Sequence, residues 1–305
     1  MRSAFIDTLT TLAKADPRVT LLVGDLGFSV VEGYAEALPR QYLNAGVAEQ
    51  NMTGLAAGLA LGVGRCVFTY SIANFNTMRC LEQIRHDVCY HRADVKVVAV
   101  GGGVTYGNQG YTHFAVEDLA IMSALPGMVV AAPADAAEAR LITELAVASP
   151  GPWYLRLGRD GEPALHADGL ERLDLGALVP VRQGSAGAVL AVGPLAVQAR
   201  QAVDLLAGEG HPLALFSVPF IKPLDTDAIR QLARNVPFLL TVEEHSGNGG
   251  LGSAVAGVLA EMGGAPPLVC MHLPERHDVI GTQAFLREHH GLDAAGIEAT
   301  LRRVL

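Results

Sequence analysis

One carboxylate in this chain stands out from its surroundings. Glu49 lies in NAGVAEQNM (residues 44–52), at the start of a helix predicted over residues 48–63 that is otherwise almost entirely apolar. A carboxylate in the first turn of a helix is favoured by the helix dipole, and that alone explains its presence. A carboxyl group in an apolar, poorly solvated place can also share a proton with a bound ligand. Glu49 is therefore the first candidate for chemistry.

A histidine and two arginines are further candidates. His113 lies in the loop sequence GNQGYTHFAVED, where it is placed to donate a hydrogen bond or shuttle a proton, or else is satisfied by backbone. Arg156 and Arg159 lie in WYLRLGR, at the end of a predicted strand. Each is by itself an ordinary surface residue, but guanidinium groups also bind phosphate bidentately.

The elements that position these residues alternate between strand and helix over the first 160 residues. Buried strands are predicted at 19–24, 67–70, 95–103, 128–133 and 153–158. Helices are predicted at 3–14, 31–38, 48–63, 75–92, 115–124 and 135–148. This alternation is typical of an α/β fold with a mostly parallel sheet and helices on both faces. Asp25 follows the first strand, at the sheet edge where ligands gather, and is a weaker candidate.

A second, smaller α/β unit is predicted after a linker rich in Gly, Asp, Glu and Pro. Its strands are predicted at 186–193, 212–218, 237–244 and 268–273, and its helices at 195–208, 225–234, 251–262 and 282–289. We therefore expect a first domain at residues 1–165, a linker at 166–185 and a second domain at 186–305. The turn GGLG (residues 249–252) either brings backbone amides to an anion or only permits tight packing.

The composition excludes several classes of protein. The net charge is -9, which opposes a nucleic-acid or anionic-membrane surface as the main partner. The N-terminal segment lacks the apolar region of a signal peptide, and no apolar run is long enough to span a membrane. The four cysteines show no metal-binding spacing and are expected to be buried thiols. These features predict a cytoplasmic protein in a reducing environment.

Several motifs, in their order along the chain, resemble the transketolase family. GVAEQNM resembles the glutamate motif of its pyrimidine-binding domain, and GGLGSAVAGVLAE resembles its C-terminal domain. The resemblance covers essentially the whole chain. The chain is similar to the C-terminal section, or beta-type subunit, of split transketolases, in which the enzyme is divided into two polypeptides.

The resemblance implies thiamine diphosphate as cofactor and gives the candidates roles. Glu49 would hydrogen-bond N1′ of the aminopyrimidine ring, which lets the cofactor's imino group remove the thiazolium proton. Phe75, in TYSIANFNTMRCLEQIRHDV, would stack on that ring, with an ordinary core position as the alternative. His113 would face the cofactor and the sugar oxygens, and Asp25 would lie beside the cofactor.

The resemblance also implies a phosphorylated sugar as substrate. Arg2, Ser29 and Arg156 match the positions that grip the substrate phosphate in the family, with Arg159 as a nearby alternate.

Two positions depart from the family pattern. Gln109 replaces an aspartate that reads the stereochemistry of the donor, and Gly101 replaces a histidine that some members carry. These departures leave the reaction type intact but favour a specialised donor over the usual pentulose phosphate.

The half of the family that binds the diphosphate is absent from this sequence. That half carries a GDG motif followed by an asparagine, whereas residues 24–26 read GDL. The resemblance therefore implies that a partner chain, the N-terminal section, holds the metal, Mg²⁺ or Ca²⁺, and that this chain binds none. It implies an α2β2 assembly in which a second copy of this chain lies across the dimer axis and each active site lies at an interface.

Three alternatives stay open at this stage. The β chain of 2-oxo acid dehydrogenases shares the domain pair, and the dipeptide Asn74-Phe75 is similar to it. Deoxyxylulose phosphate synthase is also similar, but holds both halves in one chain. A non-catalytic regulatory subunit is the third alternative, and the retained Glu49 and His113 argue against it.

Overall fold

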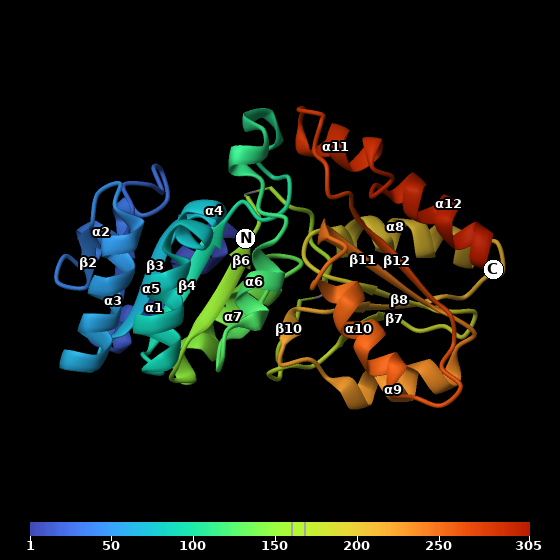
Figure 1. Cartoon of the computed structure of the whole chain (residues 1–305), viewed down its shortest axis with the longest axis horizontal. Coiled ribbons are helices and arrows are strands. Elements are labelled where there is room, and N and C mark those ends of the chain that lie inside the picture. Colours follow the sequence, from blue (N-terminus) through green and yellow to red (C-terminus); the bar gives the residue numbers. More distant parts are fainter. Residues whose placement is uncertain (160, 168) are drawn as a thin grey trace.

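The computed structural model describes residues 1–159, 161–167 and 169–305 and contains two α/β units that lie side by side (Figure 1). Within these residues, the first unit has a seven-stranded sheet in the order β10-β5-β6-β4-β3-β1-β2. Neighbouring strands are parallel except β10, which is antiparallel to β5. The strands are β1 (Val19–Val23), β2 (Tyr42–Asn44), β3 (Cys66–Ile72), β4 (Val95–Val100), β5 (Val129–Ala131), β6 (Trp153–Leu157) and β10 (Phe220–Lys222).

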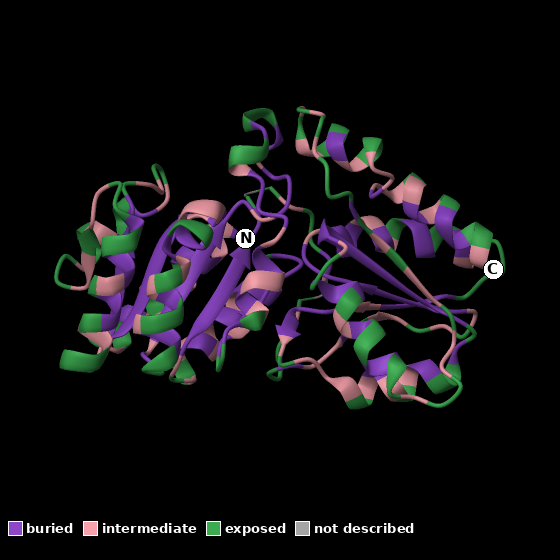
Figure 2. Ribbon diagram, in the orientation of Figure 1, coloured by how far each residue is buried: buried purple, intermediate pink, exposed green. Residues whose placement is uncertain are grey.

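Helices cover both faces of this sheet, as predicted. The longer ones are α1 (Arg2–Ala15), α2 (Glu32–Ala37), α3 (Glu49–Val63), α6 (Asp118–Ala124) and α7 (Ala136–Ala148). Alternate side chains of β1 enter opposite cores: Leu21 and Val23 join the core under α1 and α7, and Leu22 joins the core under α3. Burial on both faces explains why the central strands are almost continuously apolar in the sequence, and Figure 2 shows β3, β4 and β6 buried along most of their length. The edge strand β2 is mostly exposed.

Within the described residues, the second unit has a five-stranded sheet in the order β12-β11-β8-β9-β7. Its strands are parallel except β7, which is antiparallel to β9. The elements are β7 (Val179–Arg182), β8 (Ala188–Ala191), α8 (Leu195–Gly208), β9 (Ala214–Ser217), α9 (Thr226–Asn235), β11 (Leu239–Ser246), α10 (Leu251–Ala260), β12 (Leu268–Leu273), α11 (Gln283–His289) and α12 (Ala294–Val304). The core beneath α3 continues into this unit as far as Val255 of α10, so the two units share apolar packing.

The single helix predicted over residues 75–92 is wrong, because the structure breaks it into short pieces. These are α4 (Ala73–Asn76), a 3₁₀ turn (Met78–Cys80), α5 (Leu81–Gln83) and a π-helical segment (Ile84–Tyr90). The buried amide of Asn76 donates hydrogen bonds to the backbone carbonyls of Thr69 and Val98. Thr77 has φ -123° and ψ -82°, which are not helical. These side-chain hydrogen bonds to backbone groups compete with the backbone hydrogen bonds of a regular helix.

Three strands and one helix escape the sequence analysis. Strand β2 was missed because it has only three residues. Strand β7 was missed because it contains Pro180, which is tolerated there since β7 lies at a sheet edge. Strand β7 lies inside the segment 166–185 that was predicted to be a linker. Strand β10 comes from the predicted second domain but completes the first sheet, and α12 closes the chain.

Two details correct or resolve the sequence analysis. Cys270 lies on the edge strand β12 and is exposed, so the expectation of four buried thiols is wrong for this residue.

The anion that meets the GGLG turn is an internal carboxylate. Glu243 accepts hydrogen bonds from the backbone amides of Leu251 (2.7 Å) and Gly252 (2.8 Å), which caps α10.

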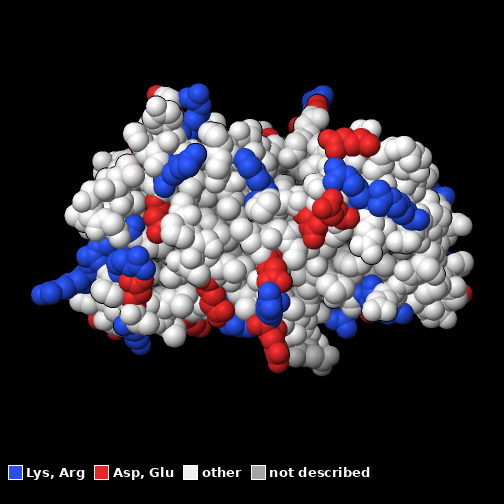
Figure 3. Space-filling view, turned by 90° about the horizontal axis from the view of Figure 1, so that it is seen from below, with Lys and Arg blue, Asp and Glu red and all other residues white. Residues whose placement is uncertain are grey.

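The surface carries both signs of charge. On the face shown in Figure 3, acidic and basic side chains are interspersed over a mostly uncharged surface. None of the helices in the described part of the chain has the length and apolar character needed to cross a bilayer.

Candidate active site

Glu49 lies at the carboxyl edge of the first sheet, where α3 begins. Its side chain is only 1% exposed, and the backbone of Gly24, just beyond β1, lies against it. Its Oε1 accepts a hydrogen bond from the Ser71 hydroxyl (3.3 Å), and its Oε2 accepts one from Nη1 of Arg79 (2.8 Å). A buried carboxylate needs such partners, because an uncompensated charge is costly away from water.

Arg79 joins two of the predicted site residues, and a third contacts one of these. Its Cζ lies 4.1 Å from the centroid of the Phe75 ring while its Nη1 contacts Glu49. The edge of the His113 ring meets Phe75, with the centroids 5.2 Å apart and the planes at 67°. Glu49, Arg79, Phe75 and His113 therefore form one contiguous cluster.

One hydrogen bond holds the His113 loop beside α4, and a second contact lies within the loop. Asn74 donates a hydrogen bond to the backbone carbonyl of Thr112 (3.2 Å), and the Thr112 hydroxyl lies 3.0 Å from Nδ1 of His113. His113 is half-buried, with part of its ring open to solvent. This position suits a hydrogen-bond donor or proton shuttle at the rim of a site.

Sequence reasoning missed Arg79 and Tyr106. Arg79 follows Phe75 by four residues, a spacing that brings side chains together on a helix, so a signal was present. Tyr106 fills the space over Gly101: a Cβ at Gly101, which has φ +87°, would lie 2.1 Å from the tyrosine ring. The centroids of the Tyr106 and His113 rings lie 6.5 Å apart.

Arg156 is buried inside the molecule. Its Nη2 donates to the backbone carbonyls of Ala115 (2.7 Å) and Glu244 (2.8 Å), and its Nε lies 3.0 Å from Asp118 Oδ2. The backbone of Gly102 packs against the Arg156 side chain so closely that a Cβ at Gly102 would lie 2.2 Å from its Nε. These contacts make Arg156 part of the joint between the two units.

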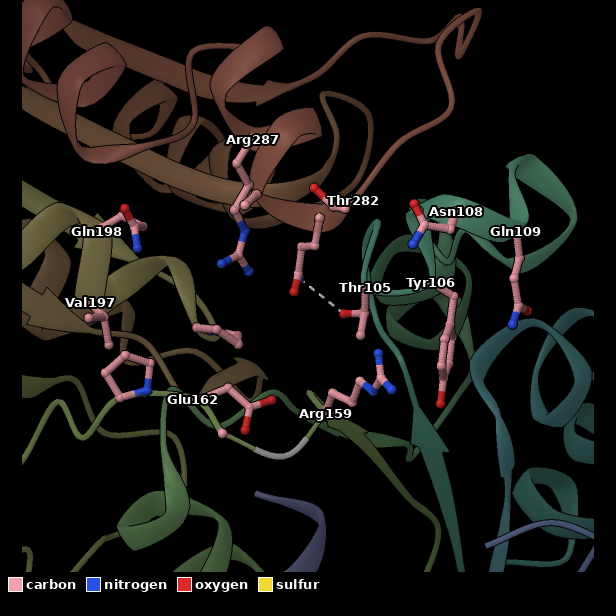
Figure 4. Close-up of a pocket in the computed structure, with 16 residues that line it drawn as sticks. Thr105, Tyr106, Asn108, Gln109, Arg159, Glu162, Val197, Gln198, Thr282 and Arg287 are labelled. Atoms are coloured by element: carbon pink, nitrogen blue, oxygen red, sulfur yellow. Dashed lines mark hydrogen bonds between the residues drawn. The ribbon is translucent and has the colours of Figure 1, made fainter. Parts of the chain in front are cut away.

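A pocket of about 470 Å³ lies between the two units (Figure 4). Gln109 and Arg159 line it from the first unit, and α8 and α11 line it from the second. Arg287 of α11 extends into it but is paired with Glu244 (Nε to Oε2, 2.7 Å). Among the described residues, no acidic side chain is paired with Arg159. Glu162 on the same wall is paired with the N-terminal ammonium group (3.1 Å).

The remaining predicted residues lie at separate places around this edge. Arg2 is half-buried at the first residue of α1, and Ser29 is exposed in the loop before α2, with φ +64°. Asp25 is exposed, and its Oδ1 accepts a hydrogen bond from the Asn44 amide (2.9 Å). Among the described residues, no group of three or more His, Cys, Asp or Glu side chains is arranged to hold a metal ion.

Comparison with known proteins gives matches over nearly the whole chain. Residues 1–161 match the model of the transketolase pyrimidine binding domain, and residues 176–297 match that of the transketolase C-terminal domain. One of the subunits of the apulose-4-phosphate transketolase of Phocaeicola vulgatus is 36% identical over 297 residues, which cover 97% of this chain and 94% of that protein.

Two further relatives are similar over nearly their full length. The 6-deoxy-6-sulfo-D-fructose transketolase subunit SqwH of a Clostridium species is 35% identical over 300 residues, which cover 97% of this chain and 92% of that protein. A solved structure described as a split gene transketolase, inactive beta4 tetramer, superposes with a TM-score of 0.88 at 35% identity. The match covers 100% of this chain and 97% of that one.

Proposed function

This chain belongs to the transketolase family, and we propose that it is the pyrimidine-binding half of a two-chain transketolase. The enzyme would move a two-carbon ketol unit from a ketose to an aldose with thiamine diphosphate. One observation carries the proposal: the buried Glu49 carboxylate lies in one contact cluster with an aromatic ring and the loop histidine, at the sheet edge where ligands bind.

The side chains of this cluster fit an aminopyrimidine ring. A cavity of about 330 Å³ opens beside Glu49 and is lined by Arg79 and residues 47–51. Glu49 offers a carboxylate for a ring nitrogen, and Phe75 offers a flat apolar surface for stacking. Thiamine diphosphate, when bound, supplies the reactive thiazolium carbon and an electron sink. Glu49 would hold the proton at the ring nitrogen, and His113 would exchange hydrogen bonds with the sugar oxygens.

The proposal includes a partner chain. The sequence lacks the GDG motif, so the diphosphate and its Mg²⁺ or Ca²⁺ would be held by an N-terminal-section chain in an α2β2 assembly. Two relatives are named as subunits, and the solved relative is an inactive tetramer of beta chains alone. These names support a chain that needs a partner for activity.

The substrate would be a ketose with an anionic end. Arg159 lies at the pocket between the units without an acidic partner among the described residues, and Gln109 lines the same pocket. A guanidinium group without a partner binds phosphate well. The names of the two relatives refer to a sugar phosphate and a sulfo sugar. We therefore propose that Arg159 receives the phosphate of the donor, with Arg2 and Ser29 as further contacts and Gln109 near the donor hydroxyls.

Reconstitution with the partner chain tests this function. We expect ketol transfer only when both chains, thiamine diphosphate and Mg²⁺ are present, with ketose phosphates as donors. Full activity of this chain alone would contradict the two-chain proposal. Turnover of pyruvate in place of ketose phosphates would favour the 2-oxo acid dehydrogenase alternative, and a complex that binds no cofactor would favour a non-catalytic subunit.

A further inference from the structure

Arg79 makes both of the contacts that the proposed function assigns to the cofactor's aminopyrimidine. Its guanidinium group is flat, lies 4.1 Å from the Phe75 ring centroid, and donates a hydrogen bond to Glu49 at 2.8 Å. A planar ring that stacked on Phe75 and donated to or accepted from Glu49 would need the same two partners. Arg79 and the pyrimidine ring cannot occupy this place at the same time, because both would use the same carboxylate oxygen of Glu49 and the same face of Phe75.

We propose that Arg79 is a displaceable cover over the pyrimidine site. Arg79 would occupy the place between Glu49 and Phe75 until the cofactor arrives, and would then swing out to solvent. This inference rests on the proposed function, because it assigns the same two side chains to the cofactor. The inference adds that the site has a closed state and an open state, which differ in the position of Arg79.

Burial explains why a cover is useful. Glu49 is 1% exposed, and without Arg79 its only other side-chain hydrogen bond, among the described residues, comes from Ser71 at 3.3 Å. A carboxylate left that way carries a large desolvation cost. Arg79 compensates the charge before the cofactor binds, and the pyrimidine ring would take over this compensation afterwards.

The surroundings of Arg79 allow it to leave. Its side chain is 42% exposed, and it lies in the 3₁₀ turn (Met78–Cys80) after the non-helical residue Thr77. Within the described residues, its side chain contacts Glu49 and Phe75, so movement toward solvent breaks one ion pair and one ring contact. The guanidinium group is already partly solvated, and the incoming ring would compensate Glu49 as Arg79 leaves, so the buried carboxylate would not be left unpaired.

A cover lowers the apparent affinity for the cofactor. The observed dissociation constant equals the intrinsic constant divided by the fraction of molecules whose site is open. If about one molecule in ten has an open site, the apparent affinity is about tenfold lower than the intrinsic affinity. Removing the guanidinium group should therefore tighten binding by roughly tenfold, with most of the gain in the association rate.

The test measures binding of thiamine diphosphate with Mg²⁺ to the reconstituted two-chain complex by calorimetry and stopped-flow fluorescence. The variants are Arg79→Ala and Arg79→Met, which both lack the guanidinium group. The matched control is Arg85→Met, because Arg85 is an exposed arginine on the nearby π-helical segment (Ile84–Tyr90) and its side chain contacts His86. We expect roughly tenfold tighter binding in both Arg79 variants and no change in the control.

Unchanged or weaker binding in the Arg79 variants would overturn the cover, because it would mean that Arg79 does not compete or instead helps to hold the cofactor. A crystal structure of the loaded wild-type complex gives an independent readout. The proposal expects Arg79 away from Glu49, and an intact contact between them would overturn it. Failure of the wild-type complex to bind any cofactor is a different result, which would remove the proposed function as well.

Discussion

At the residue scale, the two arginines that follow β6 have opposite surroundings. Arg156 is 6% exposed and bonded to carbonyls of both units, whereas Arg159 is exposed at the mouth of a pocket. A phosphate ligand needs a guanidinium group whose donors are available, so the two residues should respond differently to substitution.

Substitution of Arg159 should weaken binding of a phosphorylated donor. We expect Arg159→Gln to raise its KM by about 10- to 100-fold, since a hydrogen bond to a charged group contributes about 1.5–3 kcal/mol. Steady-state kinetics with a phosphorylated and an unphosphorylated ketose measure this, with Arg172→Gln, an exposed arginine paired with the exposed Asp174, as the control. An equal change for both donors would refute the phosphate contact.

Substitution of Arg156 should affect stability instead. Arg156→Met leaves the buried Asp118 without its cationic partner, and we expect the free energy of unfolding to fall by about 3–5 kcal/mol. Urea denaturation measures this loss. A normal unfolding midpoint together with a raised KM for the phosphorylated donor would show that Arg156 grips substrate after all.

At the element scale, the sequence predicted the sheets and the main helices because burial on both faces makes their strands continuously apolar. It also assigned Glu49, Phe75 and His113 to one site, and in the structure these side chains are linked by contacts through Arg79. Arg79 was missed although it follows Phe75 by four residues, and the break of the predicted helix at Asn76 and Thr77, whose side chains bond to backbone, was not predicted. Nothing in the local pattern indicates such long-range hydrogen bonds.

The segment between the two sheets is anchored by a histidine. Nε2 of His166 lies 2.9 Å from Oε1 of Glu138 on α7, and both side chains are buried. Burial acts to lower the pKa of His166, but the hydrogen bond and charge of Glu138 outweigh it, so the pKa is raised. A raised pKa in the folded state stabilises the fold fully below the unfolded value of about 6.5, and this contribution is lost as the pH rises through the folded value.

We therefore expect His166→Gln to lower the free energy of unfolding by about 1–2 kcal/mol at a pH below that unfolded value, and by less as the pH rises. Glutamine retains a donor for Glu138 but cannot become charged. Denaturation curves for both proteins across this pH range provide the comparison. A difference that grows with pH would show that His166 is not held as a cation.

At the scale of the whole molecule, Glu244 ties the two units together. Its buried carboxylate accepts hydrogen bonds from the Val104 backbone amide in the first unit and from Gln283 and Arg287 in the second. The continuous core beneath α3 and α10 adds apolar packing across the same boundary. Both features predict that the two units unfold together.

Removal of Arg287 should loosen this joint. We expect Arg287→Met to lower the melting temperature by about 5–10 °C, because Glu244 is left buried with fewer partners. Differential scanning calorimetry measures this shift. Arg302→Met, which removes exposed ion pairs, is the control and should leave the melting temperature nearly unchanged. Equal shifts in both variants would contradict a special role for Glu244.

The whole molecule also lacks the motif that would hold the cofactor's diphosphate, so Glu49 is proposed to act on thiamine diphosphate anchored by a second chain. The most direct measurement is the rate at which the C2 proton of the bound cofactor exchanges for deuterium in the reconstituted complex. We predict that Glu49→Gln slows this exchange by about 10²–10⁴-fold while the cofactor stays bound. Exchange at the wild-type rate in the loaded Glu49→Gln complex would contradict the proposed role of Glu49.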